Sequence, residues 1–132
     1  MDDSNRDYLL DHYENPRHQG ALEQPDGVFE DSNPVCGDRV HIEVKLSADQ
    51  ATLSDAAFTG EGCIISQAAT SIMLEDSIGK LVASIDALEP QQVLKLIGVP
   101  LTAQRVKCAL LSFKVLKGAL ADARIHKNSE LA

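Results

Sequence analysis

Residues 40–46 have the sequence Val-His-Ile-Glu-Val-Lys-Leu, in which apolar and polar side chains alternate without interruption. Successive side chains of a β-strand point to opposite faces of the sheet. The four apolar side chains therefore share one face, and His41, Glu43 and Lys45 share the other. We expect a strand here whose apolar face lies in the core and whose polar face is turned toward solvent.

Two weaker strand patterns lie on either side of this segment. Residues 27–30, Gly-Val-Phe-Glu, suit a short strand before it, and residues 52–59 alternate less regularly after it. Ser-Ala-Asp-Gln at 47–50 suits a hairpin turn between the second and third strands. Three strands that follow one another so closely favour an antiparallel sheet.

The rest of the chain has the periodicity of helices. Apolar residues recur at helical spacing, with Gly or Pro near the ends. The predicted helices are residues 4–13, 63–78, 84–88, 90–97 and 106–123. Strands followed by helices predict an α+β fold, a small antiparallel three-stranded sheet packed against helices. We expect one domain over residues 1–132, with a flexible tail from about residue 124.

Composition excludes several classes of function. The chain of 132 residues carries a net charge of −8 and no basic stripe, which argues against binding nucleic acid. No segment approaches the roughly 18 apolar residues of a membrane span, and no secretory signal is visible. Three cysteines are an odd number, so a disulfide framework is not expected. Reduced thiols in a cytoplasmic protein are the simplest interpretation.

The three cysteines lie at predicted turning points of the chain. Cys36 follows a proline turn and precedes Gly37, Cys63 follows two glycines, and Cys108 falls near the start of the last predicted helix. Asp38 is two residues after Cys36, a spacing that places both side chains on one side of an extended backbone. Three thiols and one carboxylate supply the four ligands that tetrahedral Zn²⁺ or an iron–sulfur cluster requires.

All three thiols are predicted to be deprotonated and reactive. Cys63 and Cys108 each open a predicted helix, where the helix dipole favours a thiolate. Arg105 and Lys107 add positive charge near Cys108. Because a thiolate is both a metal ligand and a sulfur nucleophile, we expect metal binding and sulfur transfer at the same site. Cys108 is our prediction for the thiol that first accepts persulfide sulfur.

Simpler interpretations of the same residues exist. A free cysteine is often only a small buried apolar side chain, and Cys108 shares a helical row with Leu111 and Val115. The thiols could also hold a structural zinc ion without any sulfur chemistry. Among the histidines, His41 falls on the strand face opposite Asp38 and is expected to point away from the site. His12 is interpreted as a capping or surface group rather than a ligand.

Three motifs resemble a known family. They are His-Tyr-Glu-Asn-Pro-Arg-His-Gln-Gly at 12–20, Asn-Pro-Val-Cys-Gly-Asp at 33–38 and Gly-Glu-Gly-Cys-Ile-Ile-Ser at 60–66. Together they resemble the U-type iron–sulfur cluster assembly family, which includes IscU, SufU and the N-terminal domain of NifU. The resemblance covers about residues 5–120 and implies a SufE/NifU-like fold. It also implies metal ligands at Cys36, Asp38, Cys63 and Cys108.

The resemblance implies a non-enzymatic scaffold. Such a protein takes iron, takes persulfide sulfur from a cysteine desulfurase, assembles a transient [2Fe–2S] cluster and passes it to apo acceptor proteins. The alternative is a SufU-like, zinc-dependent sulfur acceptor that activates the desulfurase. Lys107 resembles SufU, whereas the short segment between Cys63 and Cys108 resembles IscU. Residues 101–105, Leu-Thr-Ala-Gln-Arg, depart from the proline-rich motif by which IscU proteins recruit a chaperone.

Overall fold

The computed structural model describes residues 3–34 and 37–131. Within these described residues, three strands occupy the first half of the chain and four of the five helices follow them. In chain order the elements are α1 (Asp3–Glu14), β1 (Gly27–Asn33), β2 (Asp38–Leu46), β3 (Leu53–Glu61), α2 (Ile64–Ser77), α3 (Val82–Asp86), α4 (Pro90–Ile97) and α5 (Ala103–Leu131). The predicted α+β class is confirmed.

The strands form one antiparallel sheet in the order β1-β2-β3. Val40 faces Gly60 and Ile42 faces Phe58 in the register of β2 and β3. The apolar side chains of β2 are buried in alternation with partly exposed polar ones, as the sequence of residues 40–46 predicts. The outer edge of β3 is covered by the loop after α1, since Phe58 and residues 18–20 exchange backbone hydrogen bonds of 2.8–2.9 Å.

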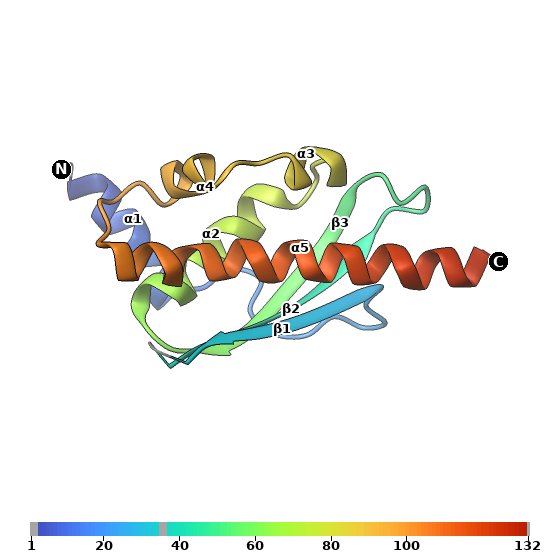
Figure 1. Cartoon of the computed structure of the whole chain (residues 1–132), viewed down its shortest axis with the longest axis horizontal. Coiled ribbons are helices and arrows are strands. Elements are labelled where there is room, and N and C mark those ends of the chain that lie inside the picture. Colours follow the sequence, from blue (N-terminus) through green and yellow to red (C-terminus); the bar gives the residue numbers. More distant parts are fainter. Residues whose placement is uncertain (1–2, 35–36, 132) are drawn as a thin grey trace.

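Helices cover the inner face of this sheet. Helix α5 runs along the sheet beside β1 and β2, and α2 packs against α5 and α1 (Figure 1). Helix and sheet approach each other closely at Gly27, where a Cβ atom would lie 2.3 Å from the carbonyl oxygen of Ala119. The core between the layers is built from aliphatic side chains, with Phe58 as a large, fully buried member.

Several elements meet at one end of the molecule. Because β2 and β3 are antiparallel, the start of β2 lies beside the end of β3, where Arg39 faces Glu61. The chain then enters α2 directly, and the first turns of α5 lie at the same end, near α1 (Figure 1). The segments that carry Asp38, Cys63 and Cys108 are thereby gathered together.

Helix α5 differs from its predicted extent. It begins at Ala103 and continues to Leu131, whereas the apolar spacing predicted residues 106–123. Its first turn contains the exposed residues Gln104 and Arg105, which carry no apolar signal. Cys108 therefore lies in the second turn of α5. The prediction that Cys108 opens this helix is wrong. Flexibility of the tail stays a prediction.

Among the described residues, no helix combines the length and apolar character needed to cross a membrane.

Candidate metal centre

Asp38 is the buried carboxylate of the candidate site. It is the first residue of β2 and only 1% exposed. Its Oδ1 accepts a hydrogen bond of 2.8 Å from the backbone N–H of Cys63, and its Oδ2 lies 3.7 Å from the Cys63 Sγ. Burial raises the pKa of Asp38, but hydrogen bonds from the Cys63 backbone, the Cys108 and Cys63 thiols and Ser66 together hold that pKa below its usual value. The carboxylate is thus favoured as an anion.

Cys63 is the partly exposed thiol of the site. It is the N-cap of α2, and its Sγ accepts a hydrogen bond of 3.4 Å from the backbone N–H of Ser66. The first turn of a helix offers unpaired N–H groups to an anion at this position. The prediction that Cys63 stands at a helix start is confirmed by this geometry.

Cys108 is the buried thiol of the site. Its exposed fraction is 0%, and its thiol contributes a hydrogen bond to Asp38. The helix dipole acts mainly within the first turn, so the dipole argument applies to Cys63 more strongly than to Cys108. Arg105, which the sequence placed near Cys108, lines a hollow of about 230 Å³ together with Cys63. Lys107 is exposed on α5.

These three side chains converge on one point. One ligand atom from each of Asp38, Cys63 and Cys108 lies within 4.8 Å of the other two. Ligand atoms around tetrahedral Zn²⁺, with bonds of about 2.0–2.3 Å, are roughly 3.3–3.8 Å apart. The cluster therefore needs only a small contraction to hold a metal ion, and two sulfurs with one carboxylate suit zinc or iron. Cys36, the fourth predicted ligand, lies outside the described residues.

The loop between β3 and α2 is shaped around Asp38. Gly62 has a φ of +137°, and a Cβ atom there would lie 2.3 Å from the Asp38 Oδ1. Only glycine combines this backbone conformation with such a close approach. The Gly62 position therefore allows the carboxylate to reach the N–H of Cys63.

Ser66 is a site residue that the sequence analysis did not single out. It is fully buried, its hydroxyl donates to the carbonyl oxygen of Cys63 at 3.2 Å, and its N–H supports the Cys63 sulfur. The available signal was its position three residues after the N-cap, where a backbone N–H meets the capping side chain.

Neither His41 nor His12 is part of the candidate metal site. His41 points to the outer face of the sheet, as predicted, and hydrogen-bonds Glu43 at 3.0 Å. The interpretation of His12 as a capping or surface group is wrong, because His12 is 2% exposed and its Nδ1 lies 2.7 Å from the Ser71 Oγ. Packing of α1 on α2 buries it, a contact that local sequence does not reveal.

The family model described as NifU-like N terminal domain matches residues 4–130 of this sequence. The chain belongs to the NifU-like N-terminal domain family. Agreement over nearly the whole length includes all of the elements that build the candidate site.

Two relatives of this NifU-like chain are named for different functions. It is 34% identical to the zinc-dependent sulfurtransferase SufU of Bacillus subtilis, with 92% of each chain covered. It is 32% identical to the iron–sulfur cluster assembly scaffold protein IscU of Haemophilus influenzae, with 86% of this chain and 90% of the relative covered.

A solved structure has the same fold. The proposed iron–sulfur cluster assembly scaffold protein for the SUF system of Fervidobacterium islandicum superposes on the NifU-like chain with a TM-score of 0.71. The two are 29% identical, and the match covers 86% of this chain and 93% of the other.

Proposed function

We propose that this protein is a non-enzymatic iron–sulfur cluster assembly scaffold. It receives ferrous iron and receives persulfide sulfur from a cysteine desulfurase. An external electron donor supplies the two electrons that reduce each persulfide sulfur to sulfide, and a [2Fe–2S] cluster is assembled on Cys36, Asp38, Cys63 and Cys108. The protein then transfers the cluster to apo acceptor proteins. The relative from Haemophilus influenzae, named as an IscU scaffold, supports this proposal.

The observation that carries the proposal is the convergence of Asp38, Cys63 and Cys108 within 4.8 Å. Soft thiolates suit iron and zinc, whereas a carboxylate is a harder and more readily exchanged ligand. One oxygen donor among sulfur donors therefore suits a carrier that must release its cargo. The partial exposure of Cys63 gives that cargo one side that a partner can reach.

Sulfur enters by thiol exchange in this proposal. A thiolate of the site attacks the outer sulfur of the desulfurase persulfide, the S–S bond breaks, and the desulfurase thiolate leaves. Cys108 stays our candidate for the accepting thiol. Because its side chain is buried, this step requires the structure around Cys108 to open.

A zinc-dependent sulfur acceptor of the desulfurase is the second candidate function. The Bacillus subtilis relative, named as a zinc-dependent sulfurtransferase, favours it, and so do Lys107 and a donor set that suits Zn²⁺. When bound, zinc would hold the thiolates of Cys63 and Cys108 in place. One of them would have to be freed before it could take sulfur.

Reconstitution separates the two functions. The purified protein is first analysed for metal, then incubated anaerobically with a cysteine desulfurase, cysteine, ferrous iron and dithiothreitol. A scaffold develops visible sulfur-to-iron charge-transfer absorption. A zinc-dependent sulfur acceptor instead contains stoichiometric zinc, strongly stimulates the desulfurase and develops little absorption.

Matched variants test the site itself. Cys63→Ser and Asp38→Asn should each lower cluster yield or zinc content, whereas Asp55→Asn, which changes an exposed carboxylate on β3, should leave both unchanged. Both functions are contradicted if Cys63→Ser binds metal and accepts sulfur as well as the wild type does.

A further inference from the structure

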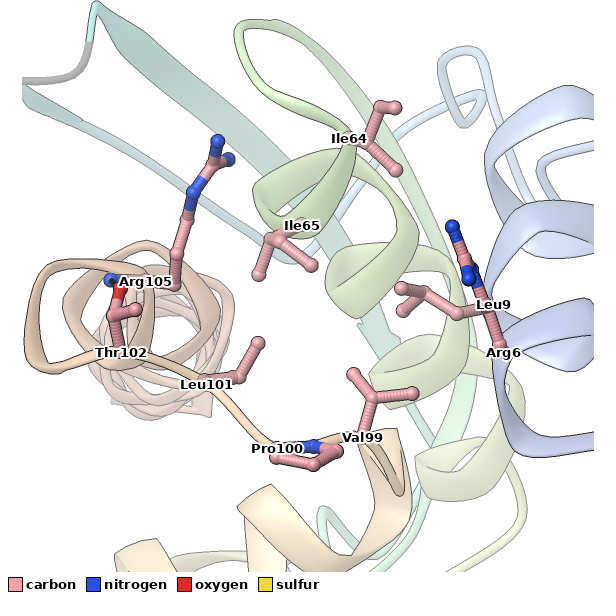
Figure 2. Close-up of a pocket in the computed structure, with 9 residues that line it drawn as sticks. All are labelled: Arg6, Leu9, Ile64, Ile65, Val99, Pro100, Leu101, Thr102 and Arg105. Carbon is pink, nitrogen blue, oxygen red and sulfur yellow. Dashed lines mark hydrogen bonds between the residues drawn. The ribbon is translucent and has the colours of Figure 1, made fainter. Parts of the chain in front are cut away.

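An apolar groove lies next to the candidate site. It has a volume of about 350 Å³, and its walls come from α1, the first turn of α2 and the loop that leads into α5. Figure 2 shows Leu9, Ile65 and Leu101 directed toward this groove, with Ile64 at its rim. Ile64 is 40% exposed, so the apolar wall extends to the protein surface.

Two arginines flank the groove on opposite sides. Arg6 reaches it from α1, and Arg105 reaches it from the start of α5 (Figure 2). The other arginines all form ion pairs with carboxylates: Arg17 with Asp11, Arg39 with Glu30 and Glu61, and Arg124 with Asp86.

Arg6 and Arg105 are different, since no carboxylate among the residues with described side chains, 4–34 and 37–126, forms an ion pair with either. Both side chains are exposed and permanently charged. In a protein of net charge −8, the two arginines that lack an acidic partner among the described side chains border the same apolar surface. This arrangement is complementary to an apolar ligand that carries negative charge at both ends.

We propose that this groove, the Arg6–Arg105 groove, binds an extended polypeptide segment of a partner protein in which apolar side chains stand between two acidic residues. A polypeptide supplies carboxylates on both sides of its apolar part, as the two guanidinium groups require. A fatty acid supplies only one. The volume is at the low end for small-molecule pockets, and the exposed wall suits a surface segment.

The position of Arg105 connects the groove with the thiol site. Arg105 lines the groove and also lines the small hollow beside Cys63. A segment bound in the groove would therefore hold its protein next to the partly exposed thiol. The identification of that partner as one that exchanges sulfur or a cluster rests on the proposed function, whereas the binding itself does not.

Peptide titration followed by nuclear magnetic resonance tests this inference. The ¹⁵N-labelled, metal-free protein is titrated with the peptide Gly-Glu-Leu-Leu-Glu-Gly, and with versions in which Lys or Gln replaces both Glu residues. We expect the acidic peptide to shift the resonances of Arg6, Ile64 and Arg105, and the Lys peptide to leave them in place. Added salt should weaken binding, because exposed charges are screened.

Variants of residues that line the groove measure how much each side chain contributes to peptide binding. Arg6→Gln and Arg105→Gln should each weaken binding by up to about fivefold, the upper end of the range for exposed ion pairs. Ile64→Ser should weaken it through lost apolar contact. Arg124→Gln is the matched control, because it removes the same charge at a site that does not border the groove, and it should bind like the wild type.

Three results would overturn the proposal. The first is the absence of shifts around the groove at millimolar acidic peptide, and the second is equal binding of all three peptides. The third, from a parallel titration with the fatty acid decanoate, is binding of decanoate but not of the acidic peptide. Because the titration uses no metal, desulfurase or sulfur, its outcome is independent of the reconstitution experiment. Either proposal can fail while the other stands.

Discussion

Solvent reaches the two described thiols of the site to different extents. Cys63 caps α2 and is partly exposed, whereas Cys108 is fully buried in the second turn of α5. Alkylation of a buried thiol requires local opening of the structure. The relative rates at which the two thiols react therefore measure how readily the structure around Cys108 opens.

We expect Cys63 to react with iodoacetamide faster than Cys108 in the metal-free protein. If opening around Cys108 costs at least about 1.4 kcal/mol, the difference is at least about tenfold. The rates are measured by mass spectrometry in a Cys36→Ser background, which leaves only these two thiols. Unfolding in guanidinium chloride is the control and should bring the two rates close together.

Equal rates in the folded protein would contradict this description of Cys108. They would instead support Cys108 as a readily available sulfur acceptor, as its sequence context suggested. A slow Cys108 that is accelerated by a bound desulfurase would agree with a partner-driven opening of the site.

At the scale of elements, the sequence predicts the bounds of a strand or helix best where its pattern is regular or its ends are marked by proline and glycine. Strand β2 follows its alternation, and α4 has the predicted bounds, Pro90–Ile97, because proline and glycine mark its two ends. Strand β1 was predicted too short. Its residues 31–33 are polar and become a strand only by pairing with β2, from Asp31 with Val40 to Asn33 with Asp38.

Part of the candidate site can be predicted from the sequence. The thiols and Asp38 could be grouped from their chemistry and motifs. The contacts of Gly62 and Ser66 with Asp38 and Cys63 could not, because they depend on how the β3–α2 loop folds over the start of β2. The apolar pattern does not reveal where α5 begins, because the first turn of this helix is polar.

A buried polar contact joins α1 to α2. The Ser71 hydroxyl contacts the His12 ring and accepts a hydrogen bond of 2.8 Å from the backbone N–H of Arg17. Burial lowers the pKa of His12 from its model-compound value of 6.5, with a further contribution from the Arg17 charge, against the raising effects of Glu75 and Asp11. The folded protein therefore keeps this imidazole neutral more readily than the unfolded chain does.

This pKa shift predicts a loss of stability in mild acid. As pH falls below about 6.5, the unfolded chain binds a proton at His12 that the folded protein does not, so the free energy of unfolding decreases. His12→Gln removes this dependence and costs about 1 kcal/mol at neutral pH, where the native hydrogen bond is disturbed. Urea denaturation at several pH values between about 5.5 and 7.5 measures both effects.

His126→Gln is the control for this prediction. His126 is exposed on α5, so its replacement should leave the pH dependence of unfolding nearly unchanged. Parallel slopes for the wild type and His12→Gln would show that His12 is not kept neutral by burial.

At the scale of the whole molecule, the candidate functional side chains lie together at one end. The sheet ends, the start of α2 and the first turns of α5 bring Asp38, Cys63 and Cys108 together, and the Arg6–Arg105 groove adjoins them. The rest of the molecule consists of an aliphatic core and an acidic surface. The same end thus offers metal ligands, one partly exposed thiol and two arginines that lack acidic partners among the described residues.

The central claim is that Cys36, Asp38, Cys63 and Cys108 form one metal-binding site, and X-ray absorption at the zinc edge tests it most directly. The zinc-loaded protein should have three sulfur neighbours at about 2.3 Å and one oxygen neighbour at about 2.0–2.2 Å. Cys36→Ser and Cys63→Ser should each have two sulfur neighbours. A wild-type site with two sulfurs or fewer, or a sulfur count that Cys36→Ser leaves unchanged, would contradict a shared site.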